Sequence, residues 1–185
     1  MIRNKHNAPV ILTNDPSITA WGWVVVKNDV VLAAGCIKTI PEHAKMRIRK
    51  SDDRTRRVSE IARQLHSIIQ EYDVNYILSE LPHGSQNAQA ATMLGVVVGI
   101  LQTMADVLSF PIEWFSEADS KKEALGKKAG SKSEMIERMR ALYNIPVKGV
   151  KYYDEAICDA MAVYNIAKIY SPVLKFYKSG MRKFV

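Results

Sequence analysis

The sequence predicts an α/β fold, with a mixed five-stranded sheet and helices on both of its faces. Three short apolar segments come first, and the second and third are expected to form a hairpin that turns at Asn28 and Asp29. Two more apolar segments then alternate with helix-periodic stretches. Because parallel neighbours need helical crossovers, a hairpin followed by strand–helix–strand units predicts a sheet with both parallel and antiparallel pairs.

The expected elements follow one another without an internal repeat. Strands are predicted at residues 10–14, 20–27, 30–39, 75–80 and 111–115. Helices are predicted within residues 42–72, 85–108, 131–143 and 154–170. The first of these helices carries Val58, Ile61 and Leu65 at spacings of three and four, which is typical of an amphipathic helix.

Length and composition favour one compact domain with an anionic partner. The chain has 185 residues, of which 48% are hydrophobic, and we expect a single domain over residues 1–170. Residues 171–185 lose periodicity and hold lysines and arginines without an acid, so a basic C-terminal tail is expected. The formal charge of +7 and the pI near 9.4 favour a partner such as nucleic acid.

The two cysteines and the lengths of the apolar runs favour a location inside the cell. Cys36 and Cys158 cannot form a disulfide framework, and each lies in an apolar stretch where a buried reduced thiol is the common case. The first nine residues lack the apolar core of a signal peptide, and no run reaches the ~18 apolar residues of a membrane span. We therefore expect a protein of the cytoplasm or another intracellular compartment, neither secreted nor bound to a membrane.

Acidic residues stand at the ends of two predicted strands. Asp15 follows the first strand, and Glu80 ends the fourth. If these strands are parallel neighbours, both carboxylates emerge at the edge where open α/β sheets bind their ligands. Asp159 lies inside an apolar helix, and Glu155, four residues earlier, shares its helical face.

Carboxylates that converge from distant parts of a chain indicate a metal site. They would repel one another unless a divalent cation lay between them, and hard oxygen ligands select Mg²⁺ or Mn²⁺. Two such ions about 3.5–4 Å apart activate water and stabilise the leaving oxygen in phosphodiester hydrolysis. Each acid alone is equally consistent with a turn, a strand end or a helix cap. Their shared edge favours the metal site.

The acidic motifs resemble those of the RuvC family of Holliday junction resolvases, within the RNase H-like nucleases. Residues 11–17, ILTNDPS, with the later Gly22, are similar to the family's first strand, so Asp15 takes the place of the first catalytic aspartate. Asn14 and Ser17 replace the family's usual apolar residue and glycine. Residues 76–80, with the helix that follows, resemble the second acidic strand, which makes Glu80 the catalytic glutamate.

Two further motifs extend this resemblance to about residue 169. Residues 120–126 and 131–133 are similar to a lysine-bearing stretch beside the family's active site, which implies that Lys121 and Lys132 lie near the scissile phosphate. Residues 159–162, DAMA, resemble the closing helix, so Asp159 would be the last catalytic acid. The resemblance implies an RNase H-like fold and a magnesium-dependent endonuclease, with two ions expected and Mn²⁺ as a substitute.

The fourth acid departs from the family pattern. The family has an acid or a histidine three residues before the final aspartate, where this chain has Ala156. Two ions carry about four positive charges, and three acids offset only three of them. Glu155 lies on the face of Asp159, whereas Asp154 is turned away by roughly 140° in a regular helix. We expect Glu155 to be the fourth ligand and Asp154 to be an N-cap or a substitute.

The resemblance also implies a homodimer acting on branched DNA. Basic side chains in residues 45–57 and in the glycine-containing segment 121–132 are expected to contact phosphates. His83 is expected near the branch point. The expected DNA contacts are His83, Ser85, Gln86, Lys121, Lys122, Lys127, Lys128, Lys132, Arg54 and Arg57. The smooth helix predicted at residues 88–100 suits either the core or a dimer interface.

Other functions stay open at this point. A second RNase H-like enzyme, acting on RNA–DNA hybrids or on branched DNA in general, would use the same metals with different binding loops. A non-catalytic DNA-binding scaffold is the third class, and the retained Asp15, Glu80 and Asp159 argue against it. No P-loop is present, so no nucleotide cofactor is expected. The sequence leaves a cellular or viral origin open.

Overall fold

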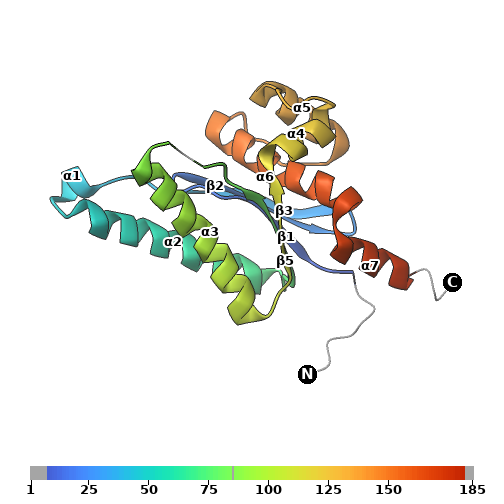
Figure 1. The fold of residues 1–185 in the computed structure, drawn as a ribbon, viewed down its shortest axis with the longest axis horizontal. Coiled ribbons are helices and arrows are strands. Elements are labelled where there is room, and N and C mark those ends of the chain that lie inside the picture. Colours follow the sequence, from blue (N-terminus) through green and yellow to red (C-terminus); the bar gives the residue numbers. More distant parts are fainter. Residues whose placement is uncertain (1–7, 85, 182–185) are drawn as a thin grey trace.

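A five-stranded sheet in the order β3-β2-β1-β4-β5 forms the centre of residues 8–84 and 86–181, which this computed structural model describes (Figure 1). The strands are β1 (Ile11–Asp15), β2 (Ala20–Lys27), β3 (Val30–Lys38), β4 (Tyr76–Leu81) and β5 (Ile112–Ser116). The helices are α1 (His43–Met46), α2 (Lys50–Glu71), α3 (Ala88–Leu108), α4 (Glu117–Leu125), α5 (Lys132–Leu142), α6 (Lys151–Tyr170) and α7 (Pro172–Met181).

The sheet is mixed, as predicted. β1–β2 and β2–β3 pair antiparallel, whereas β1–β4 and β4–β5 pair parallel. The hairpin turns at Asn28 and Asp29, whose positive φ values of 52° and 64° match a tight turn between twisted antiparallel strands. The parallel pairs place the carboxyl ends of β1, β4 and β5 along one edge.

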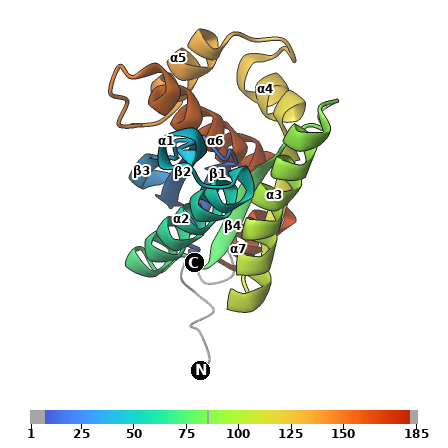
Figure 2. The same cartoon turned by 90° about the vertical axis from the view of Figure 1, so that its left-hand side faces the viewer.

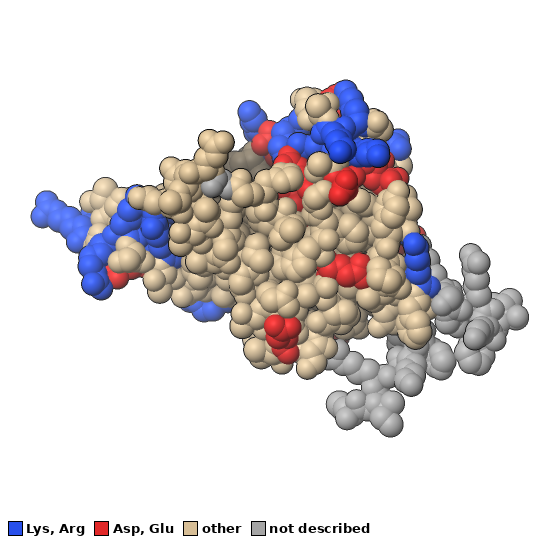
Figure 3. All heavy atoms as spheres, viewed as in Figure 1, with Lys and Arg blue, Asp and Glu red and all other residues tan. Residues whose placement is uncertain are grey.

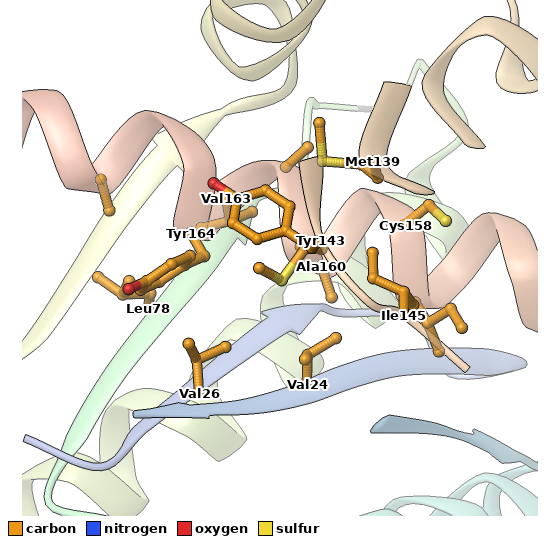
Figure 4. Close-up of a cluster of buried hydrophobic side chains, with 14 of the residues drawn as sticks. Val24, Val26, Leu78, Met139, Tyr143, Ile145, Cys158, Ala160, Val163 and Tyr164 are labelled. Carbon is orange, nitrogen blue, oxygen red and sulfur yellow. The ribbon is translucent and has the colours of Figure 1, made fainter. Parts of the chain in front are cut away.

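Helices cover both faces of the sheet, which confirms the predicted α/β layers (Figures 1 and 2). α2 and α3 lie on one face, and α6 lies on the other with α4 and α5 outside it. Successive β1 residues point to opposite faces, so Ile11 enters the core under α6 and Leu12 enters the core under α2. Figure 4 shows the first of these cores, in which Val24 and Leu78 face Val163 of α6.

Two helices differ from the sequence prediction. α4 occupies a stretch that was expected to be a glycine-containing loop. The Ser116 side chain accepts a hydrogen bond from the backbone N–H of Asp119 at its start, and Gly126 ends it with φ 72°. α6 begins at Lys151 with Val150 at its N-cap, so the expectation that Asp154 caps this helix is wrong.

The expected C-terminal tail is a helix over most of its length. Ser171, which is buried, hydrogen-bonds to the Tyr76 hydroxyl at 2.9 Å and to Glu113 at 3.0 Å. Pro172 then starts α7, where a proline costs no helical hydrogen bond, and Leu174 is buried in the core. These contacts dock residues 172–181 on the domain, which corrects the prediction of a free tail. Residues 182–185 lie outside the described part of the chain.

Cys36 and Cys158 are free, and Cys158 is buried whereas Cys36 is partly exposed. Burial raises the pKa of both thiols, that of Cys36 to about 11 and that of Cys158 to about 12. Both therefore stay protonated at neutral pH, in keeping with the expected reduced thiols.

α3 leaves most of its apolar surface uncovered. Among the described residues, it is the one helix long and apolar enough to cross a membrane, and 17% of its apolar window is buried. By itself such a helix is weak evidence for a membrane span. Val97, Leu101 and Ala105 face the core, whereas a Cβ added at Gly95 or Gly99 would meet no atom within 4 Å. The outer face of α3 is thus smooth and open.

Candidate active site

Asp15 and Glu80 are held at the ends of β1 and β4 by a buried asparagine. Asn14 pairs with Ser79 across the parallel strands, and its Nδ2 donates to the backbone oxygen of Leu78 at 3.1 Å. Its Oδ1 accepts a hydrogen bond from the Trp21 indole at 3.1 Å. Asn14 therefore fixes both strand ends just before the two acids, which gives a structural role to a residue that departs from the family pattern.

α6 crosses the sheet close to Asp15. The Thr13 hydroxyl donates to the backbone oxygen of Ala160 at 2.6 Å. Gly22 lies opposite Asp15 in the β1–β2 ladder, and an added Cβ there would lie 2.0 Å from the backbone oxygen of Ala156. A side chain at position 22 would force α6 away. Glycine thus permits the approach that brings Asp159 to the strand ends.

Lys132 lies against Asp159. Its Nζ forms an ion pair with Asp159 Oδ2, and the Asp159 side chain is 8% exposed. Ser131 and Glu134 form a reciprocal capping box that fixes the start of α5, with Lys132 as its first residue. The sequence-predicted Lys132 is therefore placed beside one of the three acids.

The three carboxylates are desolvated and repel one another. Burial, followed by repulsion from Asp159, raises the pKa of Asp15 to about 7. Burial, followed by repulsion from Asp15, raises the pKa of Glu80 to about 8. Burial also raises the pKa of Asp159, against the opposing charge of Lys132. Lys132 offsets part of this repulsion, and Lys121 also lowers the pKa of Asp159, but burial outweighs both charges.

The oxygen donors at this edge fit a hard divalent cation by their chemistry. Within residues 8–84 and 86–181, no three acidic, histidine or cysteine side chains lie close enough together to hold a metal as they stand. The Asp159 carboxylate forms an ion pair with Lys132. The carboxylates converge on one edge, but they lie farther apart than the ligands of a single bound metal ion; the three residues are Asp15, Glu80 and Asp159.

Glu117 is a fourth acid at this edge, and the sequence analysis did not identify it. β5 is parallel to β4, with Glu80 opposite Phe115, and Glu117 follows β5 as the first residue of α4. Its carboxylate raises the pKa of Asp15, Glu80 and Asp159. The rule that selected Asp15 and Glu80, an acid at the carboxyl end of a parallel strand, would have found it.

The two acids expected to supply the fourth ligand lie differently. Asp154 is buried, and its Oδ1 accepts the backbone N–H of Lys148 at 2.8 Å, so it holds the segment before α6. Glu155 is partly exposed. In the described chain, the charged groups that shift the pKa of Asp15 are Asp159, Lys132 and Glu117, and Glu155 is not among them.

The family is decided by sequence comparison. Residues 11–166 match the family model described as crossover junction endodeoxyribonuclease RuvC. The chain belongs to the RuvC family. A RuvC from Magnetococcus marinus is 26% identical over 151 residues, covering 82% of this chain and 81% of that protein. A RuvC from Chlorobium chlorochromatii is 28% identical over 144 residues, covering 74% of this chain and 70% of that protein.

Solved structures support the same fold. The Thermus thermophilus RuvC in complex with a Holliday junction substrate matches with a TM-score of 0.70 at 18% identity, covering 91% of this chain and 97% of that one. The yeast mitochondrial Holliday junction resolvase Ydc2 matches with a TM-score of 0.62 at 11% identity, covering 97% and 86%. The RNase H-like fold is thus confirmed, and as a RuvC-family member the chain is a crossover junction endodeoxyribonuclease.

Two groups of basic residues stand out on the surface of this RuvC-family chain (Figure 3). One group lies over α4 and α5, with Lys122, Lys127 and Lys128 exposed, and Lys127 pairs with Glu134. The other lies at the α1 end of α2 (Figure 3). There Arg54 reaches the Gln89 side chain of α3 at 3.2 Å.

Arg57 does not belong to either surface. It is 6% exposed and donates to Thr39, Thr19 and the backbone oxygen of Ile18. These contacts tie α2 to the segments after β1 and β3. The prediction of Arg57 as a DNA contact is therefore replaced by a structural role.

The segment after Glu80 lies near the acids. His83 is 59% exposed in its side chain, and its Nε2 lies 3.6 Å from Glu117 Oε2. Gln86 is exposed as well, and Ser85 lies outside the described residues. Lys121, which is largely buried, pairs with Glu117 one turn along α4. Lys121 and His83 thus meet at one carboxylate beside the three converging acids.

Proposed function

We propose that this RuvC-family endonuclease resolves four-way DNA junctions at the edge formed by Asp15, Glu80 and Asp159. The observation that carries the proposal is the convergence of these carboxylates from β1, β4 and α6, each with a raised pKa. Bound there, two Mg²⁺ ions, or Mn²⁺ in their place, would supply an activated water and stabilise the leaving oxygen of a phosphodiester.

The chain's own residues complete the chemistry. Lys132 offsets the charge of Asp159 in the absence of substrate, and it is the cation best placed to contact the scissile phosphate when DNA binds. Lys121, held by Glu117, lies at the same edge. His83 stands exposed beside them, where it can stack on an unpaired base at the branch point.

DNA would be held by the two basic surfaces on either side of α3. Figure 3 shows lysines and arginines over α4 and α5 and again at the α1 end, with a broad uncharged surface between them. Phosphate contacts of this kind position the duplex arms without reading their sequence. The partly exposed Arg54 and the exposed Lys122, Lys127 and Lys128 are the contacts we propose.

α3 is the proposed dimer interface. Its outer face is apolar and uncovered, and exposed apolar surface of this extent is typical of a protein–protein contact. Gly95 and Gly99, one turn apart, leave room for a second helix to approach closely. Two copies related by a twofold axis would bury α3 against α3 and present two active sites to a junction with similar symmetry.

The test compares substrates. Purified full-length protein would be incubated with Mg²⁺ and labelled four-way, three-way, Y-shaped and linear DNA, together with an RNA–DNA hybrid. Paired symmetrical cuts in the four-way junction, with linear DNA uncut, are expected. Efficient cleavage of the hybrid with an intact junction would instead favour another RNase H-like activity. Junction binding without cleavage in Mg²⁺ or Mn²⁺ would favour the scaffold.

A further inference from the structure

We infer that Glu117 is the fourth carboxylate of the metal site, in place of the acid that the closing helix lacks. This inference rests on the proposed function, since it concerns the same metal ions. It differs from the sequence-based expectation, which placed the fourth ligand on α6 at Glu155.

Within the described residues, no acid of α6 other than Asp159 acts on this edge, since Glu155 is not among the charged groups that shift the pKa of Asp15. Position 156, three residues before Asp159, faces the site, because the Ala156 backbone lies over Gly22 and Gly22 is opposite Asp15. Alanine at this position brings no oxygen. Asp154 is engaged with the backbone N–H of Lys148. Three acids then face about four positive charges from two divalent ions.

Glu117 lies at the carboxyl end of β5, the strand beside β4 at this edge of the sheet. It follows β5 directly, and the β4–β5 register places Phe115 opposite Glu80. The Ser116 N-cap fixes the first turn of α4, and thereby the position from which the Glu117 side chain extends. Its side chain is 32% exposed, so solvent reaches it.

The contacts of Glu117 resemble those of Asp159. Each carboxylate has one lysine partner: Lys121, one turn along α4, for Glu117, and Lys132 of the neighbouring helix α5 for Asp159. A lysine beside a metal ligand offsets its charge while the site holds no cation. The nearby His83 adds a second group that carries charge only when protonated. Both cation-paired carboxylates flank Asp15 and Glu80.

The alternative is that Glu117 acts only by positioning Lys121. The two roles predict different effects of removing the carboxylate. If Glu117 binds the ion, Glu117→Gln weakens metal binding, whereas Lys121→Met, which removes a competing cation, leaves metal affinity equal or tighter. If Glu117 merely orients Lys121, both Glu117→Gln and Lys121→Met should leave metal affinity unchanged and slow cleavage alike.

The experiment is a calorimetric Mn²⁺ titration of the full-length protein at pH 8.5 without DNA. Residues that only support metal ligands cost roughly 10- to 100-fold in affinity when removed, so loss of a ligand should cost at least as much. Glu117→Gln is expected to weaken Mn²⁺ binding to that extent or to lose one ion. Glu117→Asp, which keeps a shorter carboxylate, should fall between wild type and Glu117→Gln and serves if Glu117→Gln does not fold.

The control is Glu123→Gln, the same chemical change on the same helix, which should bind Mn²⁺ like wild type. Unchanged binding by Glu117→Gln, or weakened binding by Glu155→Gln instead, overturns the assignment of Glu117. Asp15→Asn separates the two proposals. If Asp15→Asn loses Mn²⁺ and Glu117→Gln keeps it, the metal site stands and the fourth ligand is wrong. If Asp15→Asn also binds normally, the proposed metal site itself fails.

Discussion

Lys132 of α5 and Asp159 of α6 form an ion pair between residues that are 27 positions apart in the sequence. This pair lies beside Asp15 and Glu80, and the charge of Lys132 lowers the pKa of both against the larger effect of burial, which raises them. Lys132 therefore has two roles, one in the free protein and one in the complex with DNA. It limits repulsion in the free protein, and it is available to phosphate once metal ions neutralise the acids.

Substitution of the three acids should separate cleavage from binding. Asp15→Asn, Glu80→Gln and Asp159→Asn are each expected to abolish Mg²⁺-dependent junction cleavage, because each removes an anionic ligand. Junction binding should persist, since the basic surfaces are unchanged. Cleavage assays and mobility shifts on one labelled junction measure both. Near-normal cleavage by Asp15→Asn in Mg²⁺ would contradict the site assignment.

Lys132→Met should lower the rate of cleavage more than the affinity for DNA. A donor that stabilises developing charge contributes about 10²- to 10³-fold to kcat, and this is the loss we expect. Lys127→Met is the matched comparison, because Lys127 is an exposed cation that pairs with Glu134 away from the three acids. It should weaken binding in a salt-dependent way and leave single-turnover cleavage near normal. Equal losses of binding and rate in Lys132→Met would show a docking charge only.

The metal-free protein should lose stability as pH rises. The pKa values of Asp15 and Glu80 are raised in the folded state to about 7 and about 8, so their protonated forms favour folding below the unfolded values near 4. That contribution disappears as pH rises through about 7 to 8. Thermal unfolding in EDTA should therefore give a lower Tm at pH 8.5 than at pH 5.5, with the difference reduced in Asp15→Asn.

Divalent ions should reverse this trend. Metal binding requires the ionised carboxylates, so stabilisation by Mn²⁺ should be larger at pH 8.5 than at pH 5.5. Glu137→Gln, an exposed acid on α5, should follow wild type in both series. A wild-type Tm in EDTA that rises steadily with pH, with Asp15→Asn showing the same rise, would argue against desolvated carboxylates at this edge.

Arg57 and Arg54 should give opposite phenotypes although they lie one helical turn apart. Arg57→Met removes the donor to the Thr39 hydroxyl oxygen and one of the two donors to the backbone oxygen of Ile18, and a buried acceptor left unsatisfied costs about 1–3 kcal/mol. Chemical denaturation should show this loss. Arg54→Met should keep wild-type stability and weaken junction binding. A stable Arg57→Met that binds DNA poorly would restore Arg57 to the DNA surface.

The dimer interface can be tested by filling the smooth face of α3. A Cβ at Gly99 meets no atom within 4 Å, so Gly99→Leu should fold, and leucine is the better helix former. It should nevertheless block close approach of a second helix and shift the protein from dimer to monomer in light scattering after gel filtration. Thr55→Leu, on the exposed face of α2, should leave the mass unchanged. A dimeric Gly99→Leu would place the interface elsewhere.

Local pattern was sufficient for the order of the strands and for two of the acids. Short apolar runs mark β1 and β4, and the chain itself places Asp15 and Glu80 where those strands end. The parallel pairing follows from the helix between them. Asp159 stood out because a charge inside an apolar helix needs a partner. These inferences depend on neighbours in the sequence, which is why they could be made without a structure.

Tertiary structure decided which residues meet, because contact and burial depend on segments that are distant in the sequence. Thr13 bonds to Ala160 across 147 positions, and that packing over Gly22 sets where α6 lies. On the other face, α2 turned Arg57 inward toward Thr39 and Ile18, although Arg57 had been predicted to contact DNA, and Leu174 of the predicted tail is buried in the core. Glu117 came to the acidic edge through the pairing of β5 with β4. The sequence determined the five strands, most of the helices, and Asp15 and Glu80 at two strand ends. The packing of the helices on the two faces of the sheet determined which residues each charge contacts.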